Sequence, residues 1–481
     1  MAQTTDGQLT AEVDAYVEEV WEDVVEDIRT LVKIESVEDL SAAEPGKPYG
    51  PKANEALMAA EGIARRLDLA VTDLDGYIGY GDVTGNEGAP YVATIAHSDI
   101  VPVGLGWSVP ALDVTRKDGY LLGRGVLDDK GPLVLSLWAA HFFARRVESM
   151  GTPLPYTLRC IIGNNEETGM ADVGHYLACC SEPAFCFSPD ADFPLICGEK
   201  GLYSGKFTSE PIGDGVIESL DGGTVSNAIP GQATAVVRVD ADKLPSRDGI
   251  DVKAAGEGRA CVTAHGKGGH ASMPEGTVNA IGALADYLLK HVENLTDAER
   301  LWLHLEQEVC HASDGKSLGI AAADDKFGAL TCVGGTVRTV GDRFVQTVDS
   351  RYPTSTSGSR ITIELRRFAA LYNATFEEGR NVAPFYIDPV SPEITTLLKT
   401  YSEYTGRKGK AFTIGGGTYA RHFRRACAFG PHEPHAKEPS WVGTEHGADE
   451  GVSEEGLKRA LKIYIVSIAR LMELELTQPE E

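Results

Sequence analysis

The chain has 481 residues, and its 71 Asp+Glu against 44 Lys+Arg give a formal net charge of −27 at pH 7. A single hydrophobic core rarely supports so long a chain, and 42% hydrophobic with 24% charged residues is the composition of a folded protein, which excludes disorder as the main state. The negative charge also argues against nucleic acid or an anionic membrane as a partner, because attraction to phosphate requires the opposite sign.

The nine cysteines form an odd set without a Cys-x-x-Cys pair, which in a chain of this size indicates buried, reduced thiols. They predict neither a disulfide framework nor a thiolate zinc site. The first 30 residues are acidic and lack the basic flank of a signal peptide, and no apolar run approaches the ~20 residues of a membrane span. We therefore expect a cytoplasmic protein.

The first part of the chain has the pattern of an α/β domain. Apolar residues at steps of three and four predict a helix between Val13 and Leu31. Further on, short apolar runs predict strands, with one helix among them. These are the strands 91–96, 157–163 and 184–187 and the helix 132–144. Strands that alternate with helices predict a mixed, largely parallel sheet between helices.

From about residue 203 to 388 the pattern changes to that of an α+β insert. We predict two strands and two helices in this insert. They are the strands 232–239 and 259–264, a helix over 278–292 and a helix after Ser359. The first pattern then resumes and ends in a helix over 457–471. The predicted organisation is one domain in two segments, 1–202 and 389–481, with a second domain of residues 203–388 inserted.

Side chains that bind metals follow each predicted strand of the first domain. They are His97 and Asp99 after the first strand, Glu166 and Glu167 after the second, and Asp190 after the third. Asp128 precedes the helix in a glycine-rich loop, and His446 lies far downstream. Ligands bind outside the carboxyl ends of parallel strands, so we expect these side chains to gather at one sheet edge. Zinc and similar divalent metals accept such a mixture of oxygen and nitrogen ligands.

These motifs occur in the order of a known family. They are His97-Ser98-Asp99, Gly123-Arg124-Gly125 before Asp128-Asp129-Lys130-Gly131, Glu166-Glu167, Ser188-Pro189-Asp190, Arg351-Tyr352-Pro353 and Gly415-Gly416-Gly417. Together they resemble the dinuclear-zinc metallopeptidase family of acetylornithine deacetylase, succinyl-diaminopimelate desuccinylase and carboxypeptidase G. Within it, the dipeptidase-V branch, which includes Xaa-His and carnosinase-like dipeptidases, is the most similar. The resemblance extends from about residue 97 to 450 and implies that the insert is a lid domain over a catalytic domain.

The resemblance also implies the cofactor and its ligands. Two zinc ions, or alternatively manganese or cobalt, would share Asp128 as a bridge. His97 and Asp190 would complete one site, and Glu167 and His446 the other. His435 is an alternative to His446, which we prefer because it lies in the terminal motif.

By the same resemblance, a hydroxide that bridges the metals would attack the substrate, with Glu166 as the general base. Asp99 would accept the free N–H of His97 and so fix its tautomer. The peptide bond between Asp128 and Asp129 is cis in relatives.

The insert and the glycine-rich run would supply substrate-binding groups. His270 would donate a proton or hydrogen bond to the carbonyl oxygen in the transition state, and Asn227 would help to hold that oxygen. Arg351 would bind the terminal carboxylate of the substrate. Gly415 and Gly416 would let the backbone approach the substrate closely. All of these residues except Asn227 also have a purely structural alternative. His270 could be a histidine at a strand end, Arg351 could form a surface ion pair, and Gly415 and Gly416 could form a plain turn.

The implied activity is the hydrolysis of dipeptides with a free N-terminus. The alternatives are an N-acyl amino acid deacylase or carboxypeptidase that uses the same dinuclear site, and a non-catalytic relative that keeps only the fold. Because the insert is longer than the lid of dimeric members, we expect one chain to supply the lid histidine to its own site. We therefore predict a monomer whose partner is a dipeptide substrate.

Overall fold

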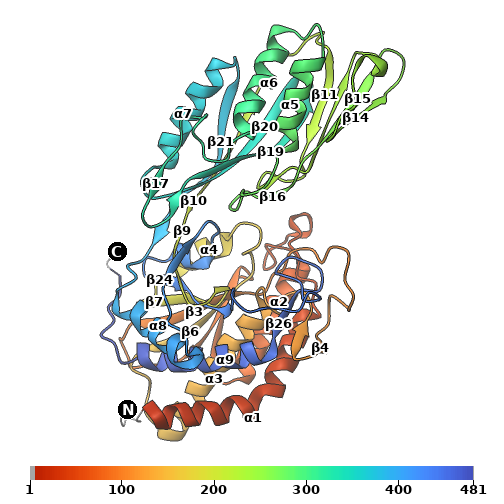
Figure 1. Cartoon of the computed structure of the whole chain (residues 1–481). Coiled ribbons are helices and arrows are strands. Elements are labelled where there is room, and N and C mark those ends of the chain that lie inside the picture. The colour runs from red at the N-terminus through yellow and green to blue at the C-terminus, as the bar shows by residue number, and fades with distance from the viewer. Residues whose placement is uncertain (1–5, 480–481) are drawn as a thin grey trace. The chain divides into compact units, whose positions relative to one another are not determined.

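The computed structural model describes residues 6–479 and divides into two compact units (Figure 1). The first comprises the chain up to Cys197, Tyr386–Phe412 and the chain from Gly417 on. The second comprises Gly198–Phe385 and Thr413–Gly416. We predict that residues 1–202 and 389–481 form the catalytic domain and that residues 203–388 form the lid domain. These two roles stay predictions.

Most of a nine-stranded mixed sheet lies in the first unit, in the order β1-β2-β6-β3-β7-β24-β9-β22, with β23 paired to β9. The strands are β1 (Ala70–Leu74), β2 (Ile78–Val83), β3 (Tyr91–His97), β6 (Thr157–Gly163), β7 (Phe185–Ser188), β9 (Ile196–Glu199), β22 (Phe385–Tyr386), β23 (Phe412–Ile414) and β24 (Ala426–Ala428). The four central strands β6, β3, β7 and β24 are parallel, whereas β1, β2 and β9 pair antiparallel with their neighbours. This confirms the predicted mixed sheet.

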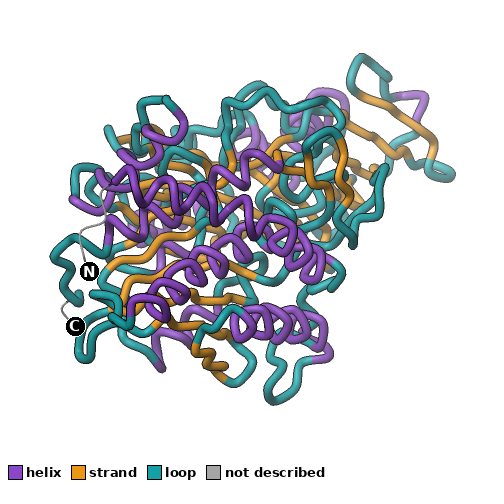
Figure 2. The backbone as a smooth tube through the Cα atoms, turned by 90° about the horizontal axis from the view of Figure 1, so that it is seen from below, coloured by secondary structure: helices purple, strands orange, loops and turns teal. Residues whose placement is uncertain are grey.

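Helices surround this sheet because its central strands are apolar on both faces: every residue of β3 and β7 is buried. The helices are α1 (Asp6–Val32), α2 (Pro51–Arg66), α3 (Lys130–Met150), α4 (Ala171–Cys179), α8 (Pro392–Thr405) and α9 (Glu454–Leu471). Helices α1, α3 and α9 contact one another, and α3 also contacts β3 and β6. Figure 2 shows several long helices side by side across the strands. The apolar residues that predicted α1, from Val13 to Leu31, are buried.

Short strands complete the first unit. They are β4 (Thr115–Lys117), β5 (Tyr120–Leu122) and β26 (Gly451–Ser453) in one sheet, and β8 (Ala191–Asp192) with β25 (Pro431–His432) in another. Strand β26 joins the C-terminal part of the chain to β5, with Gly451 opposite Leu122. Within residues 6–479, we find no helix with the length and apolar character needed to cross a bilayer.

The second unit is α+β, as predicted. Its eight-stranded sheet is antiparallel throughout, in the order β14-β15-β13-β11-β19-β20-β10-β21. The strands are β10 (Gly201–Thr208), β11 (Ile217–Gly222), β13 (Gln232–Val237), β14 (Ile250–Ala254), β15 (Ala260–His265), β19 (Thr331–Val340), β20 (Arg343–Tyr352) and β21 (Thr375–Val382). Burial alternates along β13 and β15, as expected for a sheet with one covered face.

Helices α5 (Ala280–His291), α6 (Asp297–Cys310) and α7 (Gly358–Leu371) contact this sheet and share its apolar core. Two small ribbons also belong to this unit: β12 (Ala228–Ile229) with β16 (Gly269–His270), and β17 (Ala323–Asp324) with β18 (Gly328–Ala329).

The predicted helix over 278–292 begins too early. Val278 is 54% exposed and precedes the helix, because the side chain of Asn279 caps α5 by accepting the N–H of Ile281. The predicted helix over 132–144 is longer in the structure, where α3 starts at Lys130 and ends before Gly151, which has the positive φ typical of a helix end.

Candidate metal centre

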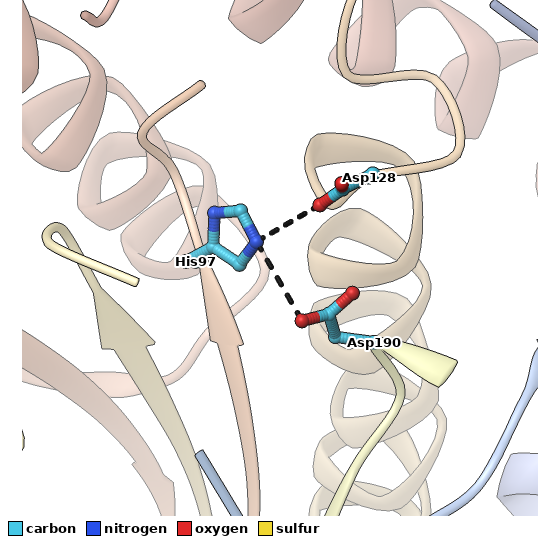
Figure 3. A group of neighbouring side chains, drawn as sticks. All are labelled: His97, Asp128 and Asp190. Carbon is cyan, nitrogen blue, oxygen red and sulfur yellow. Dashed lines mark hydrogen bonds and ion pairs between the residues drawn. The ribbon is translucent and has the colours of Figure 1, made fainter. Parts of the chain in front are cut away.

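His97 ends the buried strand β3, and its side chain is fully buried. Its Nε2 lies 3.1 Å from Asp128 Oδ1 and 3.7 Å from Asp190 Oδ2, so the ring points between the two carboxylates (Figure 3). Its Nδ1 lies 3.0 Å from the backbone oxygen of Asp99 and 3.4 Å from the Oδ1 of that residue. The ring is therefore fixed on one side by Asp99 and presents its other nitrogen to two acids.

Asp128 links this group to a second one. Its Oδ2 lies 2.9 Å from His446 Nε2, which in turn lies 3.1 Å from Glu167 Oε2. Within residues 6–479, the groups of three or more potential ligands whose atoms lie within 4.8 Å of one another are these two, His97–Asp128–Asp190 and Asp128–Glu167–His446. The structure thus brings all five predicted ligands together. His435, the alternative to His446, is in neither group.

The peptide bond between Asp128 and Asp129 is cis. Asp129 is fully buried, and its Oδ2 accepts the backbone N–H of His97 at 2.9 Å. The loop that carries Asp128 is thereby connected to the end of β3.

Asp99 holds the turn that carries Glu166 and Glu167. Its two carboxylate oxygens accept the backbone N–H groups of these residues, each at 3.2 Å. Asp99 therefore contacts His97 mainly through its backbone and the two glutamates through its side chain. Glu166 belongs to neither ligand group. Burial, and after it the charge of Asp190, raises the pKa of Glu166 well above its ordinary value.

The electrostatics of the two groups fit a bound cation. Burial and the nearby charge of Asp128 raise the pKa of Asp190 to about 7 and also raise the pKa of Glu167. Hydrogen bonding to Asp128 and Glu167 raises the pKa of His446 to about 11. The buried Oε1 of Glu167 has no hydrogen-bond partner within the described residues. Crowded carboxylates with an open oxygen, next to two imidazoles, form a donor set that suits two divalent cations.

Asn227 and His270 lie together in the second unit. Ala228 of β12 pairs with His270 of β16, and the backbone oxygen of Asn227 accepts the N–H of Ala271 at 2.9 Å. The His270 ring is exposed, and its Nδ1 lies 2.6 Å from Ser272 Oγ. The ribbon thus brings these two predicted lid residues together.

Arg351 lies on β20 and forms a buried ion pair with Asp349. Its Nε lies 2.7 Å from Asp349 Oδ1 and its Nη2 3.2 Å from Oδ2, while Nη1 donates to the backbone oxygen of Gly415 at 3.4 Å. A Cβ atom at Gly415 would lie only 3.0 Å from Ser272 Cβ, so this close approach favours glycine. At Gly416 a Cβ atom would make only ordinary contact.

Four residues with notable contacts were not among the predicted site residues: Asp349 in the second unit, and Asp172, Tyr419 and Glu450 in the first. Asp349 shares a strand face with Arg351, two residues on, which the alternation of a strand could have indicated. Asp172 accepts the N–H groups of Asn164 and Asn165 and the hydroxyl of Tyr419. Glu450 ends the terminal motif, and its contacts with the Asp128 loop span over 300 positions, which no local pattern reveals.

The mixed sheet thus gathers two groups of potential metal ligands around one shared carboxylate, an arrangement that a dinuclear metal centre requires. The model of "Peptidase family M20/M25/M40" matches residues 93–470, and the chain belongs to this family, as the sequence motifs predict.

Relatives match over nearly their whole length. The chain is 29% identical to "Putative dipeptidase YtjP" of Bacillus subtilis (strain 168), covering 94% of this chain and 97% of that one. It is also 29% identical to the Beta-Ala-Xaa dipeptidase of Lactobacillus delbrueckii subsp. lactis, covering 95% and 97%. The structure of the di-peptidase Dug1p from Saccharomyces cerevisiae has the same fold, with a TM-score of 0.58 at 13% identity over 97% of this chain and 99% of that one.

Proposed function

We propose that this peptidase is a metal-dependent dipeptidase that hydrolyses the amide bond of dipeptides with a free N-terminus. The observation that carries the proposal is the position of Asp128, which places one carboxylate oxygen in each of two ligand groups. The likeness to a Beta-Ala-Xaa dipeptidase over nearly the full length of both chains supports the substrate class.

The cofactor would be two divalent cations, zinc or alternatively manganese or cobalt. The residues that would hold them are His97 and Asp190 on one side, Glu167 and His446 on the other, and Asp128 between them. Such a pair supplies Lewis acidity toward the carbonyl oxygen and lowers the pKa of a water molecule.

Glu166 would act as the general base. Glu166 lies in the turn after β6 and directly precedes Glu167, but it belongs to neither ligand group. Its raised pKa suits a carboxylate that accepts a proton from water and passes it to the leaving amine. Asp99 would position it, because its carboxylate binds the backbone N–H groups of both Glu166 and Glu167.

The second unit would bind the substrate. Asp349 occupies the Nε and Nη2 side of Arg351, which orients the guanidinium and leaves further N–H groups for the terminal carboxylate of a dipeptide. His270 and Asn227, next to each other on their ribbon, would donate to the carbonyl oxygen of the scissile bond. Gly415 and Gly416 would allow the substrate to approach the backbone.

The test is a substrate screen on protein that has been stripped with a chelator and reloaded with zinc, manganese or cobalt. The panel contains β-alanyl and α-dipeptides, tripeptides and N-acetyl amino acids. We expect metal to restore the cleavage of dipeptides, with tripeptides and N-acetyl amino acids cleaved poorly. Preferred cleavage of N-acetyl amino acids would instead identify a deacylase, and no cleavage by protein that holds two metals would contradict the proposal.

A further inference from the structure

The two loops that carry Asp128 and His446 are far apart in the sequence but are held by one buried side chain, Glu450. Its Oε1 accepts the backbone N–H groups of Gly125 and Leu127 at 3.0 Å each and of Asp128 at 3.1 Å. Three backbone hydrogen bonds to one carboxylate oxygen fix the loop from which the Asp128 side chain extends.

Arg124 extends this connection to the His446 loop. Its guanidinium is almost fully buried and pairs through Nη1 with Glu450 Oε2. Its Nη2 donates to the backbone oxygen of Gly447, the residue after His446, at 3.1 Å. The ion pair therefore contacts the backbone at Asp128 and the backbone next to His446.

The position of Glu450 is itself well defined. Its backbone oxygen accepts the N–H of Gly123 at 3.0 Å, and the next residue pairs with β5 at the start of β26. The turn before Glu450 is tight. His446 and Asp449 both have positive φ, and the N–H of Gly443 donates to the backbone oxygen of Asp449 at 2.7 Å. Such a turn needs external contacts to keep one conformation.

The other ligands depend on regular structure instead. His97 is the last residue of β3, and Asp190 follows β7 by two positions. Both strands lie within the parallel centre of the sheet, where neighbouring strands fix the backbone.

We propose that Glu450 and Arg124 are positioning residues that set the metal affinity of the group Asp128–Glu167–His446. This inference rests on the metal centre of the proposed function. Residues that orient metal ligands typically change metal affinity by about 10–100-fold when they are replaced.

The test is a zinc titration of the metal-free protein by isothermal titration calorimetry, followed by cobalt absorption spectra. Glu450→Gln keeps the size of the side chain and an acceptor oxygen, but its amide N–H₂ opposes the donors of Arg124. We expect the binding event of the group Asp128–Glu167–His446 to weaken by about 10–100-fold, and the other event, which shares only Asp128 with the two loops, to weaken less. The cobalt spectrum should correspondingly lose the bands of one site at equal metal concentration.

Arg124→Lys is the second variant, because it keeps the positive charge but cannot form the same fork to Glu450 and Gly447. We expect it to weaken the same event, and it decides the question if Glu450→Gln does not fold. Glu393→Gln is the matched control: Glu393 on α8 is also buried and paired with an arginine, Arg425, and neither residue is in a ligand group. Circular dichroism of each metal-free variant establishes that it is folded.

Wild-type affinity for both events in folded Arg124→Lys or Glu450→Gln would overturn the proposal, as would an equal weakening in Glu393→Gln. A wild-type protein without two binding events would overturn it together with the metal centre. Because peptide hydrolysis is not measured, an absence of dipeptidase activity would count against the proposed function alone.

Discussion

At the scale of single residues, burial and the charge of Asp128 act in the same direction on two acids of the candidate metal centre, Asp190 and Glu167. Burial alone would favour the neutral forms of Asp190 and Glu167, and the neighbouring Asp128 adds to this effect, so the pKa of both carboxyls rises. Divalent cations would act in the opposite direction, because their charge favours the ionised carboxylates. We infer that these side chains are arranged for the ionised state that metal binding would stabilise.

A substitution at Glu166 can distinguish the loss of catalysis from the loss of metal binding. We expect Glu166→Ala to lower kcat for dipeptides by about 10²–10⁴-fold, because the general base is lost, while both metals stay bound because Glu166 is in neither ligand group. Steady-state kinetics together with metal analysis of the purified variant measure the two effects. Glu87→Ala, in an exposed loop, is the control and should behave like the wild type. Undiminished hydrolysis by Glu166→Ala would exclude this residue as the base.

At the scale of secondary structure, much of the fold could be predicted because the signals are local. The apolar run 157–163 coincides with β6, and the steps of three and four near the ends of the chain coincide with the buried faces of α1 and α9. Val278 shows where apolar spacing fails to locate the start of a helix. It is in phase with the apolar residues of α5, but Asn279 caps the helix, which begins only at Ala280. The sequence analysis did not predict strands β19 and β20. They pair with each other in the middle of the second sheet.

Helix α6 carries a buried acid whose effect on stability depends on pH. Burial raises the pKa of Glu306 from 4.5 to about 8. Between these values the folded protein keeps a proton that the unfolded chain has lost, so the stability falls as pH rises from 4.5 to 8. We expect Glu306→Gln to remove this loss and to raise the free energy of unfolding at pH 8 by on the order of 4 kcal/mol, with little effect at pH 4.5.

Urea denaturation of the wild type and the variant at both pH values checks this prediction. Glu308→Gln on the same helix is the matched control, because Glu308 is exposed. A stability difference for Glu306→Gln that is equal at the two pH values would show that the carboxyl does not titrate as we infer.

At the scale of the whole molecule, the site could be predicted only in part. The candidate ligands His97, Glu167 and Asp190 follow local strand patterns, which the sequence displays directly. The contacts of Glu450 with Arg124 and of Tyr419 with Asp172 join segments more than 240 positions apart. Such contacts depend on the order of strands in the sheet, and no spacing within one segment encodes it.

The length of the insert predicts the oligomeric state. The second unit has its own apolar core, and the resemblance to dipeptidases of the V branch implies that a chain completes its own site. We therefore expect a monomer with a mass near 51.5 kDa in size-exclusion chromatography with light scattering. A concentration-independent mass of twice this value would contradict the prediction.

We propose that two cations share Asp128 as a ligand. Anomalous diffraction at the zinc absorption edge, from crystals grown with zinc, tests it most directly. We predict two peaks on either side of Asp128, one contacting His97 and Asp190 and the other contacting Glu167 and His446. Crystals with ample zinc that show no peak at Asp128, or peaks only at other residues, would contradict the account.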